Sequence, residues 1–365
     1  MKKKKLDDIT ILRVIGILLV VLAHATHAYT SGWVYETHVK SSFFRRLTLY
    51  VYSFHMPLFL FISGAVYYFC RKELEKYNDF KAFAWNKIKR LVVPYIFVGS
   101  VYLVPIRLKL GINLYPGITY GGAIFNQILR VQIPGGLWYV VMLFNIFIVF
   151  RLFEKLIDAN PIITNLIIFS FLYYWSPKIT NQYQISRTCF HIIYFYLGYL
   201  FQQYKNQIIE KLKMLKYPFW ILFITHFCLF TFMRKCLRVP YPYFLWRMLN
   251  LSVRIIVPVL GIGYCYFAVL WILNKIPKIT ENKIIKVLDK NNFIIYLFHE
   301  PIIYCILYKL YDSSMKPIIL VNICFWVSLL GSLILAFIIN KSIILRFLTG
   351  NKFKKNILNK RFINT

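Results

Sequence analysis

The sequence predicts an all-α protein, an integral membrane helix bundle of about ten transmembrane helices with both termini in the cytoplasm. First, 59% of the 365 residues are hydrophobic and the mean hydropathy is +0.57, well above the values of soluble domains. Second, apolar windows alternate with charged or Gly/Pro-rich joints. Third, most of the 45 lysines and arginines fall in alternate joints. We therefore expect a single transmembrane domain over residues 1–365, with a basic cytoplasmic tail at 341–365.

The expected spans follow one another along almost the whole chain. A helix needs about 20 apolar residues to cross a hydrocarbon layer of about 30 Å, so the shorter windows are expected to be tilted, buried or re-entrant. The spans are residues 9–29, 47–70, 91–110, 137–153, 162–175, 190–203, 218–233, 248–273, 293–311 and 318–340.

The basic residues determine the expected orientation. With the amino terminus inside, the inner joints and the two termini, including the lysine run at 2–5, hold more than twice as many Lys and Arg as the outer joints. The formal charge of +32 is then explained by attraction to anionic lipids of the inner leaflet, and no nucleic-acid partner is required. Seven scattered cysteines without a C-x-x-C pair favour neither a disulfide framework nor a metal site.

The first span carries two ionisable side chains, Arg13 and His24. They are eleven residues apart, so a helix places them on one face, about 16 Å from each other along its axis. Each residue alone has a structural interpretation: Arg13 can extend to the lipid headgroups, and His24 can bond to a neighbouring helix. Their alignment favours a functional polar track that faces the protein interior.

The second span contains His55 just before Pro57, and Ser63-Gly64 further along. His55 has two interpretations that remain open, a side chain that caps the kink at the proline or a functional group in a cavity shared with His24. The small pair Ser63-Gly64 predicts that another helix approaches closely there.

Three more residues are expected at membrane depth in the eighth and ninth spans, namely Arg254, His299 and Glu300. Arg254 is expected too deep in its span for its side chain to extend easily to the lipid headgroups. His299 and Glu300 place a base beside an acid in apolar surroundings, where a carboxylate needs a cation or a proton. We expect Arg13 or Arg254 to be the partner of Glu300.

Lys87 and Arg90 end a basic approach to the third span. They are three residues apart and so share a helix face. Such a pair suits a polyanion, for example the phosphates of a nucleotide-like donor. Ordinary positive-inside charge is the competing interpretation, and spacing alone favours it.

Taken in order, these segments resemble the membrane-bound acyltransferase-3 family. The segment FHMP at 54–57 makes the sequence most similar to the branch of fucose 4-O-acetylase-like sugar O-acetyltransferases. The resemblance rests on Arg13 and His24, FHMPLFLFISG at 54–64, KIKRLVVPY at 87–95, Leu137-Trp138-Tyr139, Arg187 followed by FYLGYLF at 195–201, and IYLFHEPI at 295–302.

The resemblance implies an enzyme of about ten spans in the plasma membrane. Such an enzyme takes an acyl group, usually acetyl, from cytoplasmic acetyl-CoA or another acyl-CoA and places it on a hydroxyl of a cell-surface or lipid-linked saccharide. It implies that Arg13 and His24 are essential, and that Lys87 and Arg90 correspond to the family's basic pair. A lysine at position 87 keeps the charge but lacks the bidentate fork of an arginine.

Acyl transfer to a hydroxyl needs a base for the hydroxyl proton and stabilisation of a developing oxyanion. We expect His24 to be the base, Arg13 to orient the donor or neutralise its phosphates, and Glu300 to orient an arginine or histidine. Lys87 and Arg90 are expected to bind the donor together with Arg13. The residues expected to contact the acceptor are His55, Arg254, His299 and Trp138.

Two other classes of protein remain open. A transporter or flippase of a lipid-linked or anionic sugar would use the polar track as its route, although no internal repeat of the kind common in transporters is visible. A glycan polymerase or glycan-binding scaffold would need only basic and aromatic outer loops, such as residues 234–247.

Overall fold

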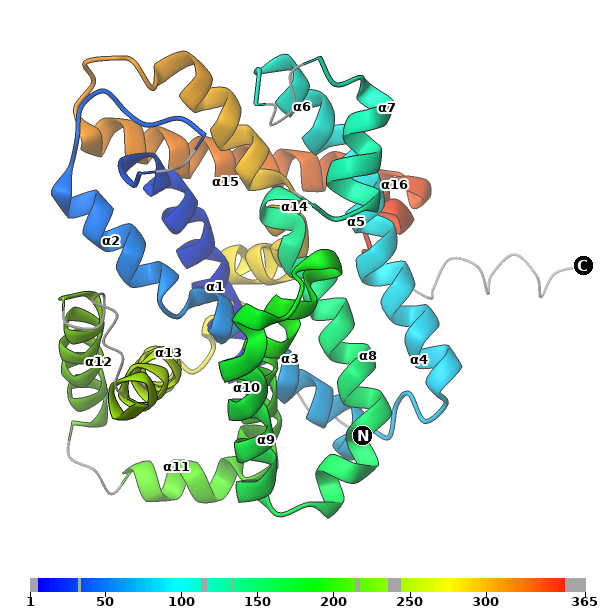
Figure 1. Cartoon of the computed structure of the whole chain (residues 1–365), viewed down its shortest axis with the longest axis vertical. Helices are drawn as coiled ribbons and strands as arrows, with labels where there is room; N and C mark the ends of the chain where they lie inside the picture. Colours follow the sequence, from blue (N-terminus) through cyan, green and yellow to red (C-terminus); the bar gives the residue numbers. More distant parts are fainter. Residues whose placement is uncertain are drawn as a thin grey trace, which may run out of the picture.

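The computed structural model describes residues 6–31, 34–112, 117–132, 134–213, 217–235 and 244–351. Over these ranges the protein consists of helices and short helical turns, and no strand occurs in them (Figure 1). The all-α prediction is thus confirmed for this part of the chain. The lysine run at 2–5, part of the outer loop 234–247 and most of the basic tail 341–365 lie outside the described residues.

Seven helical segments of the described chain are long and apolar enough to cross a membrane. Three further expected spans also form helices, namely α9 (Ile162–Trp175), α10 (Ile185–Gln203) and α12 (Pro218–Lys235). The total of about ten and the cytoplasmic position of both termini stay predictions. The seven segments are Asp7–Tyr29, Ser42–Glu73, Phe80–Lys109, Gly135–Ala159, Met248–Lys275, Lys283–Leu310 and Pro317–Lys341.

Two of the seven segments contain more than one α-helix. The second joins α2 (Ser42–Tyr52) to α3 (His55–Tyr68), and the third joins α4 (Phe80–Lys87), α5 (Val93–Val98) and α6 (Val104–Lys109). Wide π-helical turns at Ile88–Val92 and Gly99–Leu103 precede the prolines of α5 and α6, because a proline lacks the N–H group that would continue the helix. The remaining helices are α1 (Asp7–Ala25), α7 (Tyr120–Ala123), α8 (Trp138–Ala159), α11 (Lys205–Lys213), α13 (Phe244–Lys275), α14 (Lys283–Leu310), α15 (Pro317–Lys341) and α16 (Ile343–Leu348).

Helices α3 and α10 approach each other at backbone distance. A Cβ atom at Gly64 would lie 1.9 Å from the carbonyl oxygen of Phe195, and one at Gly198 would lie 1.9 Å from that of Phe61. Only glycine fits at both places. The close approach predicted from Ser63-Gly64 is therefore confirmed.

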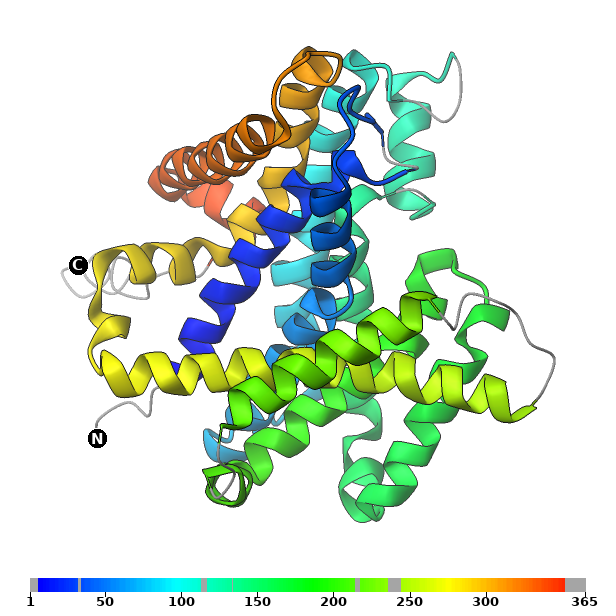
Figure 2. The same ribbon diagram turned by 90° about the vertical axis from the view of Figure 1, so that its left-hand side faces the viewer.

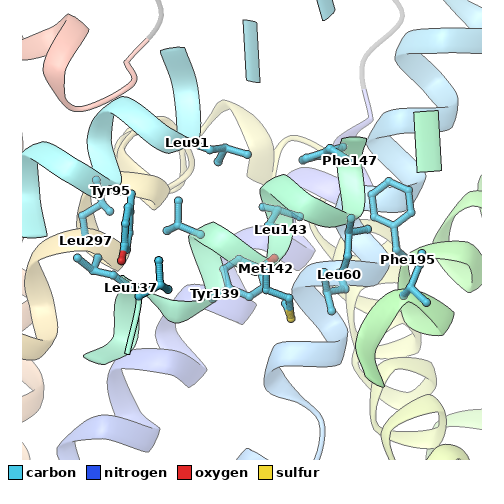
Figure 3. Packing of buried hydrophobic residues seen from close by; sticks show 14 of the residues in the cluster. Leu60, Leu91, Tyr95, Leu137, Tyr139, Met142, Leu143, Phe147, Phe195 and Leu297 are labelled. Carbon is cyan, nitrogen blue, oxygen red and sulfur yellow. The ribbon is translucent and has the colours of Figure 1, made fainter. Parts of the chain in front are cut away.

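The largest apolar cluster surrounds α8 (Figure 3). Tyr139 and Phe147 of α8 belong to it, together with Leu60 of α3, Phe195 of α10 and Leu297 of α14. The rings of Phe147 and Phe195 meet edge to face, with centroids 5.4 Å apart. The first turn of α8 also meets α14, where the ring centroids of Tyr139 and Tyr296 are 5.6 Å apart.

The start of α1 is fixed by a buried carboxylate. Asp8 accepts a hydrogen bond of 2.7 Å from the hydroxyl of Tyr266 on α13 and forms an ion pair of 2.7 Å with Lys205 on α11. Figure 2 shows α13 beside α12, lying across the lower half of the bundle. The position of α1 is thus set from one end, while its flank packs along α14 and α15.

Candidate active site

Helices α1 and α14 lie side by side and carry two pairs of groups at the same spacing. The guanidinium Nη2 of Arg13 lies 2.9 Å from Asp289 Oδ1, and Nδ1 of His24 lies 3.9 Å from Glu300 Oε1. On each helix the two groups are eleven residues apart, about 16 Å along the axis. The common face predicted for Arg13 and His24 is confirmed, because both side chains meet α14.

The partner expected for Glu300 was wrong. Arg13 is about 16 Å further along α1 and pairs with Asp289 instead. Arg254 is exposed and donates to Asn250 of its own helix at 2.5 Å. The carboxylate of Glu300 accepts from the backbone N–H of Gly136 at 2.7 Å and from the hydroxyl of Tyr304 at 2.5 Å.

A cavity of about 870 Å³ surrounds the Arg13–Asp289 pair. We call it the basic cavity, because five cations and a single carboxylate are among its described lining residues. The predicted donor-binding residues all face it. The cations come from α1, from the end of α4, from the turn that follows it, from α14 and from α16, and are Arg13, Lys87, Arg90, Lys290 and Arg346.

Lys290 and Arg346 entered the sequence analysis only as part of the inner positive charge or the basic tail. Lys87 also contacts an aromatic ring, since its Nζ atom lies 3.2 Å from the ring centroid of Phe147. The ring of Phe147 holds the lysine at the cavity wall.

Two tyrosines connect the basic cavity to the His24–Glu300 pair. Tyr139 and Tyr296 line the cavity, and their ring centroids are 5.6 Å apart. The hydroxyl of Tyr296 donates to the carbonyl oxygen of Gly136, whose N–H donates to Glu300. A continuous series of contacts therefore leads from the cavity to the second pair.

His24 lies among other rings. The centroid of His299 is 5.0 Å away, that of Tyr52 is 6.0 Å away and that of His27 is 6.2 Å away. His55 reaches the same group through Tyr52, with ring centroids 4.7 Å apart. The structure thus brings three of the predicted site residues, His24, His55 and His299, into one histidine cluster.

The backbone contacts of His55 and His299 fix their orientation. His55 Nδ1 lies 2.9 Å from the carbonyl oxygen of Val51, and His299 Nδ1 lies 2.9 Å from the carbonyl oxygens of Ile295 and Tyr296. A ring held through Nδ1 in this way presents Nε2 to its surroundings.

A buried cation that the sequence analysis did not single out lies beyond Glu300. Arg107 of α6 is 5% exposed and donates to Gln127 Oε1 at 3.1 Å. Its guanidinium carbon is 5.8 Å from the ring centroid of Tyr304, the residue that donates to Glu300. The signal was available, because an arginine inside the expected span 91–110 is itself a functional candidate.

Gly135 and Gly136 allow these side chains to meet the start of α8. Gly135 has φ +56°, and a Cβ atom there would lie 2.4 Å from Arg107 Nη2. A Cβ atom at Gly136 would lie 2.2 Å from Glu300 Oε2. A side chain at either position would therefore displace Arg107 or Glu300 from its present place, and the positive φ of Gly135 itself favours glycine.

The two other predicted acceptor contacts lie elsewhere. Trp138 packs under Arg187, whose guanidinium carbon is 4.4 Å from the indole ring, and next to His191. Among the described residues, neither Trp138 nor Arg254 lines the basic cavity.

The comparison with known families identifies the type of chemistry. The family model described as an acyltransferase domain of the acyltransferase-3 type matches residues 6–339. The chain belongs to the acyltransferase-3 family. No curated protein and no solved structure matches this acyltransferase. Its apolar helices and its family together indicate a multi-pass membrane acyltransferase.

Proposed function

We propose that this acyltransferase moves an acetyl or other acyl group from cytoplasmic acyl-CoA to a hydroxyl of a cell-surface or lipid-linked saccharide in the plasma membrane. The observation that carries the proposal is the arrangement of α1 and α14. One end of this helix pair borders a basic cavity, and the other end carries a histidine–carboxylate pair.

The basic cavity supports the donor part of the proposal. Cations from α1, α4, the turn after α4, α14 and α16 suit a ligand with several phosphates, because arginine and lysine form charge-assisted bonds with phosphate oxygens. A volume of about 870 Å³ lies in the upper part of the range of about 300–1,000 Å³ found for small-molecule and cofactor sites. We assign Arg13, Lys87 and Arg90 to the phosphates of acyl-CoA.

The His24–Glu300 pair supports the transfer part. Glu300 faces Nδ1 of His24, so we assign uptake of the acceptor's hydroxyl proton to Nε2. The hydroxyl oxygen then forms a bond to the thioester carbon, the carbon–sulfur bond breaks, and the leaving thiolate receives the proton from His24. Glu300 orients the imidazole and stabilises its protonated form, as a carboxylate does beside a catalytic histidine.

The acceptor is the saccharide hydroxyl that reaches His24. His299 is the nearest of the proposed acceptor contacts, and His55 belongs to the same histidine cluster. The FHMP segment that contains His55 supports a sugar acceptor of the kind used by the fucose 4-O-acetylase-like branch.

The test uses the purified full-length protein in sealed vesicles, with acetyl-CoA labelled in its acetyl group on one side and a saccharide on the other. Label recovered on the saccharide supports the proposal. Saccharide that crosses the vesicle wall without label contradicts it and favours a transporter. Absence of both label and movement for every saccharide of the organism's own envelope also overturns it.

A further inference from the structure

The chain continues past the region matched by the family and covers part of the basic cavity. The match ends at residue 339, whereas the described chain continues through α16 to Asn351. We call residues 342–351 the carboxyl-terminal wall. Arg346, Gly350 and Asn351 of this wall all line the cavity.

Gly350 fastens the wall to the turn that carries Arg90. It has φ +72°, and a Cβ atom there would lie 2.7 Å from the carbonyl oxygen of Arg90 and 2.8 Å from Pro94 Cγ. A left-handed backbone in direct contact with another backbone has room only for glycine. The wall therefore packs directly against the turn that carries Arg90 and against Pro94.

Hydrogen bonds between asparagine side chains connect the wall to α15 and α14. Asn351 Nδ2 donates to Asn340 Oδ1 at 3.2 Å, and Asn340 Nδ2 donates to Asn291 Oδ1 at 3.2 Å. The backbone N–H of Asn351 also donates to the carbonyl oxygen of Arg346 at 2.9 Å. These bonds connect α14, α15 and the wall, so the position of Arg346 at the cavity is set by packing.

The charges of the cavity exceed what the basic pair supplies. Its five cations and one carboxylate, Asp289, leave a formal excess of four positive charges among the described lining residues. A CoA molecule carries about four negative charges, since its diphosphate has two and its 3′-phosphate about 1.5 to 2. Arg13, Lys87 and Arg90, with the carboxylate of Asp289 subtracted, supply a net of two positive charges, which is only half of that charge.

We propose that the carboxyl-terminal wall is part of the donor site and that Arg346 binds a phosphate group of acyl-CoA. This inference rests on the proposed function, because it takes acyl-CoA as the ligand of the basic cavity. It adds a phosphate-binding residue that lies outside the region matched by the family, and it makes α16 part of the enzyme's binding machinery.

The charge of Arg346 is tested by calorimetric titration of the purified full-length protein with CoA. R346Q should weaken binding about tenfold or more, since a charge-assisted bond to phosphate is lost. K341Q is the matched control, because Lys341 is an exposed cation just before the wall, and its affinity should equal that of the wild type. Titration with dephospho-CoA locates the contact. If R346Q loses affinity for CoA but not for dephospho-CoA, Arg346 binds the 3′-phosphate. If it loses affinity equally for both, Arg346 binds the diphosphate.

The seating of the wall is tested by G350A, which leaves every charge in place. The added methyl group should displace the wall and weaken CoA binding about as much as R346Q does. G111A is the matched control, because Gly111 also has a positive φ (+67°) but no atom of the described chain lies within 4 Å of its Cβ position. If G350A does not fold, R346Q alone decides.

The outcomes separate the two proposals. A wild-type protein that does not bind CoA overturns the proposed function. A wild type that binds CoA while R346Q and G350A bind it equally well leaves the proposed function intact and overturns the role of the wall.

Discussion

The two ends of the α1–α14 pair have the same spacing but opposite surroundings. At the basic cavity the side chains of Arg13 and Asp289 are 36% and 24% exposed, whereas at the histidine cluster those of His24 and Glu300 are 14% and 9% exposed. A wet, cation-rich site suits ligand phosphates, and a dry site strengthens the electrostatic interactions on which proton transfer depends. One helix pair thus provides two chemically distinct sites about 16 Å apart.

The comparison predicts that substitutions at the two ends affect different measurements. Changes in the histidine cluster should lower turnover and leave the affinity for CoA unchanged. Changes in the basic cavity should alter the affinity for CoA, and the effect should depend on salt.

The largest effect is expected for H24A. Removal of the base should lower acyl transfer by about 10² to 10⁴-fold, while the dissociation constant of CoA stays at the wild-type value. Steady-state rates and calorimetric titration measure the two quantities. H38A serves as the control, because His38 is an exposed histidine that pairs with Asp312. Acyl transfer by H24A at the wild-type rate would remove His24 from the mechanism.

The next effect is expected for G136A. The new methyl group occupies the place of Glu300 Oε2 and should turn the carboxylate away from His24, which lowers kcat by about 10 to 100-fold. G121A is the control, since no atom of the described chain lies within 4 Å of that Cβ position. A loss of CoA affinity in G136A would contradict the separation of the two ends.

A smaller effect is expected for R13Q. Its dissociation constant for CoA should rise by about tenfold at low salt and by less at high salt, because the lost interaction is between charges in a partly exposed site. K89Q removes a neighbouring cation that packs on Trp85 and does not line the basic cavity within the described chain. If R13Q and K89Q weaken CoA binding equally, the overall positive charge of this region, and not the position of Arg13, determines the affinity.

The smallest effect is expected for D289N. Asp289 repels the ligand's phosphates but also holds Arg13, and a partly exposed ion pair contributes at most about 1 kcal/mol. The two effects nearly cancel, so we expect CoA to bind up to about threefold more tightly. A much weaker affinity would mean that the positioning of Arg13 outweighs the repulsion. Titration at two salt concentrations measures the change.

Helical periodicity made part of the site predictable. The eleven-residue spacing of Arg13 and His24 indicated a common face, which the structure confirms. The same spacing, counted back from Glu300, leads to Asp289, so helical periodicity also points to this residue. Lys290 and Arg346 were not distinguishable from positive-inside charge, because composition does not tell which cations share a cavity.

The remaining parts of the site depend on contacts between distant segments. Gly136 meets Glu300 across 164 positions of sequence, and nothing near either residue predicts that bond. The wrong partner for Glu300 has the same cause, since the order of the spans does not reveal which helices are neighbours. The wide turns at Ile88–Val92 and Gly99–Leu103 were likewise not predicted from the prolines that follow them.

The crossing of α3 and α10 has a consequence for how the enzyme can move. Because Gly64 and Gly198 bring the two backbones into direct contact, neither helix can slide or roll past the other without a steric clash. These two helices therefore form a fixed pair within the bundle. Because Tyr139 belongs to α8 and Tyr296 to α14, any opening between the two rings must come from displacement of α8 or α14 relative to this fixed pair of helices.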